Sequence, residues 1–194
     1  MPGSKTDFGE NAVLNVLFGA SVTAPTNWYL AAHVVSKWRP NQAYTAGTFV
    51  YPSSGTPKRL YRCTTAGTTG SSEPNWPDTA DATVNDGTVV WTEATSALEA
   101  GTFPPEVSGN GYSRVTIANN TTNWPAATGG VKRNANAIVF PQATGDWGVI
   151  GLFVFRDASS GGNAWFYVIP ENFREILSGD ELRIPANWLS IYED

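Results

Sequence analysis

The densest run of apolar residues in this chain lies between Phe140 and Pro170. β-branched and aromatic residues dominate 149–155 and again 164–169, and the turn-forming sequence DASSGGN (157–163) separates the two runs. Two such runs around a glycine-rich turn predict a β-hairpin. Because both runs are almost continuously apolar, we expect both faces of this hairpin to be covered, which places it at the centre of the core.

A helix is predicted near the N-terminus. Thr6 or Asp7 is suited to be its N-cap, Glu10 is spaced to complete a capping box with Asp7, and Gly19 is suited to end it. Four apolar residues are expected on its buried face: Ala12, Val13, Val16 and Leu17.

Elsewhere the pattern predicts short strands separated by turns, among them 28–35, 136–140 and 188–192, with 96–105 as a linker. The composition of the sequence changes within 36–95, where aromatic residues are dense and aliphatic residues are few. We therefore expect a mainly β fold: a β-sandwich-like domain with one N-terminal helix, formed by 1–35 and 96–194, and a small β module (36–95) inserted in one of its loops.

Composition narrows the possible partners. Of the 194 residues, 41% are hydrophobic and only 15% are charged, and the formal net charge is −5. The absence of a Lys/Arg cluster argues against a nucleic-acid partner, and no apolar run approaches the ~18 residues of a membrane span. Cys63 is the only cysteine, so neither an intramolecular disulfide nor a cysteine-based zinc site is expected.

Candidate catalytic groups are few. His33 is the only histidine and lies in a predicted strand, which favours a structural role. Asp78, Asp81 and Asp86 offer oxygen ligands for calcium, but their spacing matches no known calcium loop and favours turn chemistry. We expect no catalytic residue, no metal and no cofactor.

The aromatic residues of 36–95 are the strongest binding signal. They are Trp38, Tyr44, Tyr51, Tyr61, Trp76 and Trp91. Trp91 lies in an apolar strand and is expected in the core of the module. Trp76 lies between prolines in a polar loop, and an exposed indole offers a flat apolar face to a sugar ring or to another protein. Trp38, Tyr44 and Trp76 are therefore the candidate glycan-binding residues.

The flanking segments resemble a widespread group of tailed-bacteriophage virion proteins of the tail-fibre type. The resemblance rests on six ordered motifs: DFGENA (7–12), WYLAAH (28–33), EVSGNGYSR (106–114), FPQATGDWG (140–148), DASSGGN (157–163) and SGDELRIP (178–185). In that group the strand containing YLA is followed closely by the EVSG motif, whereas here 36–95 separates them.

Residues 36–95 resemble small aromatic modules of phage tail proteins, some of them similar to chitin-type carbohydrate-binding modules. The matching motifs are WRPNQAY (38–44), GTFV (47–50), LYRCTTAG (60–67), EPNW (73–76) and DGTVVW (86–91).

Together, the two resemblances imply a non-enzymatic component of the phage virion, on the tail or capsid surface, that forms a homo-oligomer or binds other virion proteins. The module would contact a cell-surface glycan during host attachment. The alternatives are a capsid decoration or head-fibre protein and, from another class, a glycan hydrolase, whose paired carboxyl groups are defined by distance in space.

Overall fold

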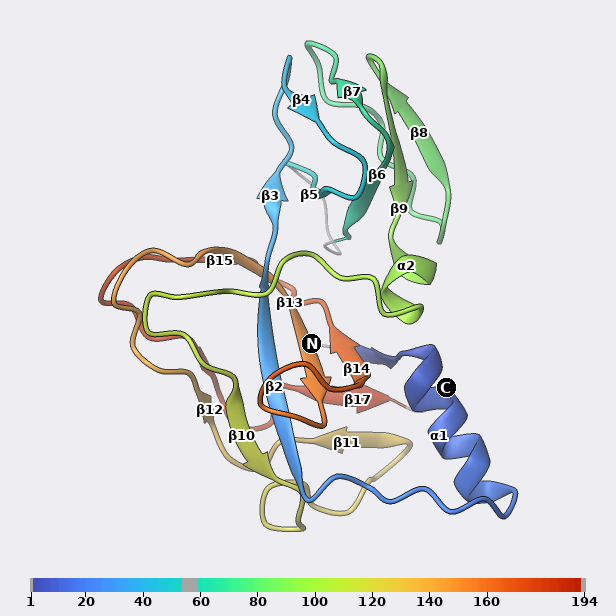
Figure 1. Cartoon of the computed structure of the whole chain (residues 1–194), viewed down its shortest axis with the longest axis vertical. Coiled ribbons are helices and arrows are strands. Elements are labelled where there is room, and N and C mark those ends of the chain that lie inside the picture. Colours follow the sequence, from blue (N-terminus) through green and yellow to red (C-terminus); the bar gives the residue numbers. More distant parts are fainter. Residues whose placement is uncertain (1, 54–58, 193–194) are drawn as a thin grey trace.

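Strand β13 (Gly148–Arg156) runs through the centre of the computed structural model, which describes residues 2–53 and 59–192 (Figure 1). It pairs antiparallel with β2 (Asn27–Val34) along one edge. Along the other edge it pairs with β14 (Ala164–Val168) and β15 (Arg174–Ile176). The predicted central hairpin is confirmed, and residues 150–155 of β13 are all buried.

The largest sheet has eight strands, in the order β10-β2-β13-β14-β1-β17-β11, with β15 also beside β13. Its other members are β1 (Pro2–Lys5), β10 (Val115–Ala118), β11 (Val131–Arg133) and β17 (Ser190–Tyr192). Strands β12 (Ile138–Val139) and β16 (Arg183–Ile184) form a separate antiparallel pair. The predicted mainly β fold is thus confirmed. The sequence did not predict β1, which joins the two ends of the chain by lying between β14 and β17.

One face of the large sheet carries the first hydrophobic cluster. Leu30, Phe153 and Phe155 project from the sheet, and Phe140 and Trp147 pack on them from the segment that precedes β13. Ile138 and Ile184 of the β12–β16 pair belong to the same cluster. The sheet therefore has a second layer over this face, as a sandwich-like fold requires.

Helix α1 (Asp7–Leu17) confirms the predicted helix but not its predicted face. Thr6 is the N-cap, and its hydroxyl oxygen accepts a hydrogen bond from the Gly9 N–H at 3.2 Å. Only Gly9 and Ala12 are buried, whereas Val16 is 56% and Leu17 70% exposed. A side chain at position 9 would collide with the backbone of β14, so glycine allows the first turns to approach the sheet while the last turn extends past it.

A second, short helix replaces part of the predicted linker. Helix α2 (Thr95–Glu99) packs Leu98, which is 1% exposed, against the second face of the large sheet. Among the described residues, no helix has the length and apolarity needed to cross a membrane.

Residues 36–95, here called the insert, form sheets whose strands all come from the insert, whereas the remaining residues form the body. A five-stranded sheet has the order β3-β5-β6-β9-β8, and β4 pairs with β7. The strands are β3 (Ser36–Lys37), β4 (Ala43–Tyr44), β5 (Phe49–Tyr51), β6 (Tyr61–Thr65), β7 (Gly67–Thr68), β8 (Thr83–Asp86) and β9 (Val89–Glu93). The insert occupies one end of the long axis of the molecule (Figure 1).

The insert and the body share one hydrophobic cluster. Phe49 and Leu60 of the insert belong to the same cluster as Leu152 and Val154 of β13. The Tyr51 ring also meets the Phe173 ring of the body edge-on, with centroids 4.8 Å apart. The base of the insert therefore covers part of the outer face of the central sheet.

The chain enters and leaves the insert at the same end of its sheet. The strand register aligns Ser36 with Val50, Val50 with Tyr61, and Tyr61 with Glu93. Ser36 and Glu93 are thus three strand spacings apart, or about 14 Å. A short surface connection would span this distance, which supports our proposal that 36–95 is an insertion in a loop of the body.

We predict that a chain with Ser36 joined to Ser96 through six Gly/Ser residues folds cooperatively but is less stable than the full chain. Six residues reach about 20 Å, enough for the gap. Loss of Phe49 and Leu60 exposes Leu152 and Val154, which should lower the free energy of unfolding by about 2–5 kcal/mol. Circular dichroism during thermal and urea unfolding would measure this. An insoluble or non-cooperative product would show that insert and body are one folding unit.

Candidate functional site

The three candidate glycan-binding residues differ in exposure. Trp38 is only 7% exposed and belongs to the core of the insert, so its ring faces are covered by protein. Tyr44 and Trp76 are partly buried at the edge of that core. Each packs against Trp91, with ring centroids 5.0 Å and 6.0 Å from it respectively. The fold therefore brings Tyr44 and Trp76 together at the edge of one aromatic cluster, whereas Trp38 lies inside the core of the insert.

A buried carboxylate organises this cluster. Asp86, which is 4% exposed, accepts hydrogen bonds through Oδ2 from the indole N–H groups of Trp38 at 2.7 Å and Trp91 at 3.0 Å. Its Oδ1 accepts the Gly70 N–H at 2.7 Å. Three donors satisfy the buried charge and hold both tryptophans in fixed orientations. Asp86 therefore has a structural role in the core of the insert.

Trp76 is held by packing and by one hydrogen bond. Its ring lies 4.3 Å from the Tyr61 ring, and its Nε1–H donates to Glu73 Oε1 at 2.9 Å. Partial burial acts to raise the pKa of Glu73, but hydrogen bonds from Ser53 and Trp76 outweigh it and hold the pKa below its usual value. Glu73 is thus ionised at neutral pH and fixes the orientation of the Trp76 ring, whose remaining surface faces solvent.

Asp81, which was also considered for calcium, has structural partners too. Asp81 accepts hydrogen bonds from the backbone N–H and the hydroxyl of Ser96, at 3.0 Å and 2.5 Å. These bonds tie the loop before β8 to the start of α2. Within residues 2–53 and 59–192, no three His, Cys, Asp or Glu side chains are grouped as metal ligands.

His33 is buried in the body beside an ion pair. Its Nδ1–H donates to the Pro104 carbonyl oxygen at 2.7 Å, while Nε2 has no hydrogen-bond partner among the described residues. Nearby, Arg114 makes two 2.7 Å bonds to Glu106. Tyr112 donates to Glu106 at 2.9 Å and accepts the Ala32 N–H at 2.9 Å. These bonds tie the EVSGNGYSR motif to β2, so the motif acts structurally.

Burial lowers the pKa of His33 from 6.5 to about 4, despite opposing contributions from the Pro104 hydrogen bond and the Glu106 charge. Arg156 and Arg114 also lower it. The folded protein therefore keeps His33 neutral at pH values where an unfolded chain would protonate it. Stability is fully present above pH 6.5 and is lost as the pH falls towards about 4.

We predict that the free energy of unfolding falls by about 3 kcal/mol between pH 6.5 and pH 4 because of His33. His33→Asn retains an N–H donor for Pro104 and removes the titration. Urea unfolding of both proteins at several pH values would measure the effect. Since His33 is the only histidine, an equal loss in the variant over this interval would contradict the assignment.

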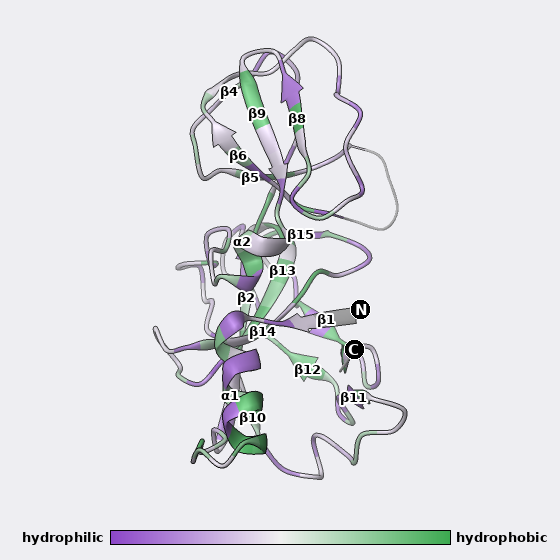
Figure 2. Ribbon diagram, turned by 90° about the vertical axis from the view of Figure 1, so that its right-hand side faces the viewer, coloured by the Kyte–Doolittle hydropathy of each residue, from purple (hydrophilic) through white to green (hydrophobic). Residues whose placement is uncertain are grey.

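Sequence reasoning missed two surfaces of the body. The first is the exposed end of α1, where Leu14 is 52%, Leu17 70% and Phe18 84% exposed (Figure 2). Beside it lies a cavity of about 310 Å³, with Trp28, Trp124 and Phe166 in its wall. The second is a groove at Trp188, which precedes β17 on a turn instead of starting a strand as predicted. Helical periodicity in the sequence identified the apolar residues of α1, but it did not indicate which of them face solvent.

Exposed apolar surface on the body, such as the end of α1, is typical of protein–protein interaction sites. Comparison with protein-family models finds a match over residues 95–192 to the family described as podophage GP4 fiber I protein gp80. Since this is just over half of the chain, the protein belongs to that family and is a fibre-type structural component of a phage virion. A search of curated proteins found no match.

The family match confirms the predicted relationship to phage fibre proteins over residues 95–192, whereas residues 1–35 of the body lie outside it. It begins at Thr95, directly after β9, and ends in β17. It therefore spans α2 and the central hairpin but includes no strand of the insert. The resemblance of the insert to carbohydrate-binding modules stays a prediction.

Proposed function

We propose that this protein is a non-enzymatic tail fibre or tail-associated protein that assembles through its body and displays the insert to the host surface. The observation that carries the proposal is the arrangement in Figure 1, with the insert at one end of the long axis and α1 on the body away from it. Contacts made through α1 would leave the insert free to reach a ligand.

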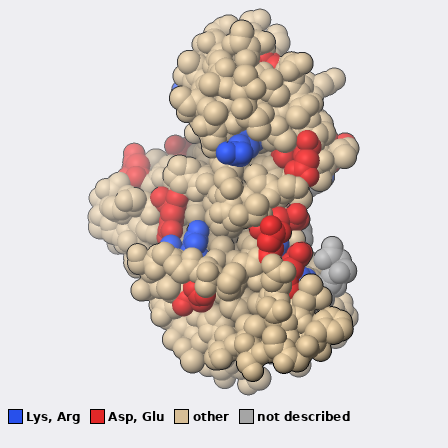
Figure 3. Space-filling model, turned by 45° about the vertical axis from the view of Figure 1, so that its right-hand side comes forward, with Lys and Arg blue, Asp and Glu red and all other residues tan. Residues whose placement is uncertain are grey.

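The outer surface of α1 supports assembly. Phe8 is 41%, Leu14 52%, Val16 56%, Leu17 70% and Phe18 84% exposed, a concentration of apolar residues on one short helix. Exposed apolar patches of this kind mark protein interaction sites. Charges are also sparse over much of the face in Figure 3, where acidic residues form a few small groups. A second copy or another virion protein would bury this helix.

We predict that replacing Leu17 and Phe18 together with Asp weakens assembly. Both side chains are mostly exposed, so the substitutions should change the free energy of unfolding by only about 0.5 kcal/mol each. Two charges in an apolar contact should dissociate the oligomer. Light scattering of the purified full chain would show a multimer for the unmodified protein and a smaller species for the variant.

Leu177→Asp is the matched control. Leu177 is 48% exposed and follows β15, on the opposite side of the body from α1 in Figure 1. This variant should assemble normally. A monomeric unmodified protein at micromolar concentration, with no virion protein bound to α1, would refute assembly through this surface.

The aromatic edge of the insert supports glycan binding. Tyr44 and Trp76 share the buried Trp91 as packing partner, and both retain exposed surface. Such rings stack on the apolar face of a sugar. The Glu73 carboxylate already accepts hydrogen bonds from Ser53 and Trp76, and it has room for one more donor such as a sugar hydroxyl. One such site binds weakly, and repetition on an oligomeric virion would supply avidity.

We predict that Tyr44→Ala and Trp76→Ala each reduce binding of the assembled protein to host bacteria by about tenfold, because avidity amplifies a small loss at each site. Trp76→Ala should also cost about 1–2 kcal/mol of stability, since its ring packs on Tyr61. Fluorescence of labelled protein on cells and thermal melting would measure the two effects separately.

Thr64→Ala is the control for this experiment, because Thr64 is exposed on a strand of the same insert. Unchanged binding by folded Tyr44 and Trp76 variants would reject the glycan-binding role and favour a spacer or protein-contact role. Binding to the capsid rather than the tail would favour the head-fibre alternative. Release of reducing sugar from host glycans would favour the hydrolase alternative.

A further inference from the structure

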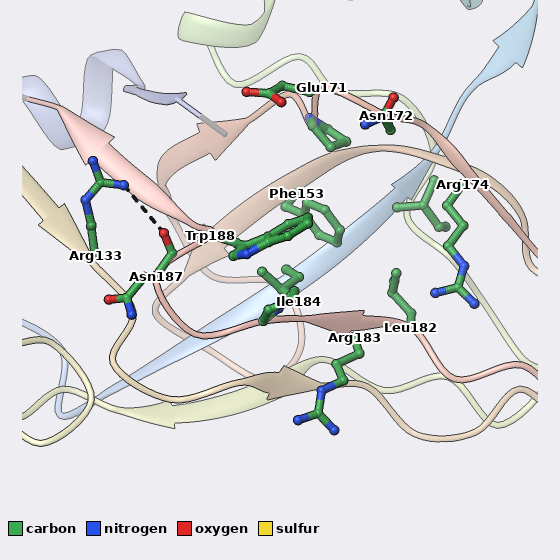
Figure 4. A pocket seen from close by; sticks show the side chains of 13 residues that line it. Arg133, Phe153, Glu171, Asn172, Arg174, Leu182, Arg183, Ile184, Asn187 and Trp188 are labelled. Carbon is green, nitrogen blue, oxygen red and sulfur yellow. Dashed lines mark hydrogen bonds between the residues drawn. The ribbon is translucent and has the colours of Figure 1, made fainter.

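A groove of about 490 Å³ lies in the body beside the turn that carries Trp188 (Figure 4). Its floor is apolar and formed by buried side chains, including Phe153, Leu182 and Ile184. Polar side chains surround this floor in Figure 4, among them three arginines and two asparagines. Grooves of this size with an apolar floor and a few convergent polar groups are typical of small-ligand sites.

Trp188 is presented at this groove by a rigid turn. Its side chain is 63% exposed. The Trp188 N–H donates to the Pro185 carbonyl oxygen at 3.3 Å, and Asn187 adopts the left-handed conformation with φ of 65°. This arrangement corresponds to a turn with asparagine at its third position.

Buried Asn134 fixes both ends of that turn. Its side-chain amide donates to the Pro185 carbonyl oxygen and its Oδ1 accepts the Leu189 N–H, each at 2.9 Å. Asn134 is 2% exposed. The backbone that carries Trp188 is therefore fixed before any ligand arrives, which reduces the entropy lost on binding.

The groove is locally positive in a protein of net charge −5. Arg133, Arg174 and Arg183 line it, against Glu171 as the acidic side chain in the lining. Arg133 donates to the Ser190 hydroxyl at 2.7 Å, whereas no carboxylate in the described part of the chain lies within ion-pair distance of Arg174 or Arg183. Both residues are exposed. Arg174 is the strand partner of Ile150, which lines the groove, and its guanidinium is able to pair with an anion there in bidentate fashion. Arg183 lies between Leu182 and Ile184, so its side chain is on the other face of β16 and points away from the floor in Figure 4.

We propose that this groove binds an anionic saccharide. Trp188 stacks on the apolar face of a sugar ring, and Arg174 pairs with its carboxylate or phosphate group. The side-chain amides of Asn172 and Asn187 lie in the lining and suit sugar hydroxyls. This site is in the body, within the family-matched region, and is independent of the aromatic edge of the insert.

The first experiment applies the purified full chain to an array of carboxylated, phosphorylated and neutral glycans. We expect the protein to bind the anionic glycans of the array. Comparison of the carboxylated with the phosphorylated glycans shows which anionic group the groove prefers. Calorimetric titration with the tightest-binding oligosaccharide then tests the residues. Trp188→Ala should weaken binding by about tenfold and Arg174→Gln by about three- to tenfold, whereas Arg183→Gln, on the outer face of β16, should have little effect. Affinity should also fall as salt is raised.

Leu177→Ala and Arg39→Gln are matched controls, since they remove an exposed apolar side chain and an exposed arginine outside the groove lining. Both should bind normally. The proposal is overturned if the array retains only neutral glycans or none, or if the controls weaken binding as much as the groove variants. It is also overturned if Trp188→Ala lowers the oligomer mass in light scattering, because the groove would then be a contact between protein chains.

Discussion

The burial of β13 on both faces is the constraint on which the rest of this structure depends. A strand of nine residues with six consecutive buried positions requires a covering layer on each side. Phe153 and Phe155 are covered by aromatic residues from the loops and by the β12–β16 pair, whereas Leu152 and Val154 are covered by α2 and the base of the insert. The insert therefore contributes to the core of the body, because it completes the second layer over the strand at the centre of the body.

The core of the insert, by contrast, has to be formed from few residues. Aromatic rings supply most of its buried volume, but each indole brings an N–H group that must be satisfied when buried. Asp86 accepts from two of them and from a backbone N–H, so one carboxylate fixes Trp38 and Trp91 together. The same arrangement places Tyr44 and Trp76 at the edge, where their rings stay partly exposed.

The proposed surfaces lie on different parts of the molecule. Assembly through α1 would leave the insert exposed at one end of the long axis. The groove at Trp188 combines an aromatic ring with arginines, whereas the edge of the insert combines aromatic rings with a carboxylate. The two sites therefore suit chemically different ligands, and both would gain from repetition in an oligomer.

The sequence by itself determined the central hairpin, the N-terminal helix, the mainly β fold and the relationship to phage fibre proteins, because each of these depends on local pattern or on ordered motifs. Only the tertiary structure decided which residues are exposed. Leu17 and Trp188 look like core residues in the sequence, yet α1 extends past the sheet and Asn134 holds Trp188 on a turn. Trp38 looks like a surface residue of a turn-rich segment, yet Asp86 holds it in the core. The burial of Trp38 and the turn at Trp188 depend on hydrogen bonds between residues 48 to 55 positions apart in the chain, which no local pattern records.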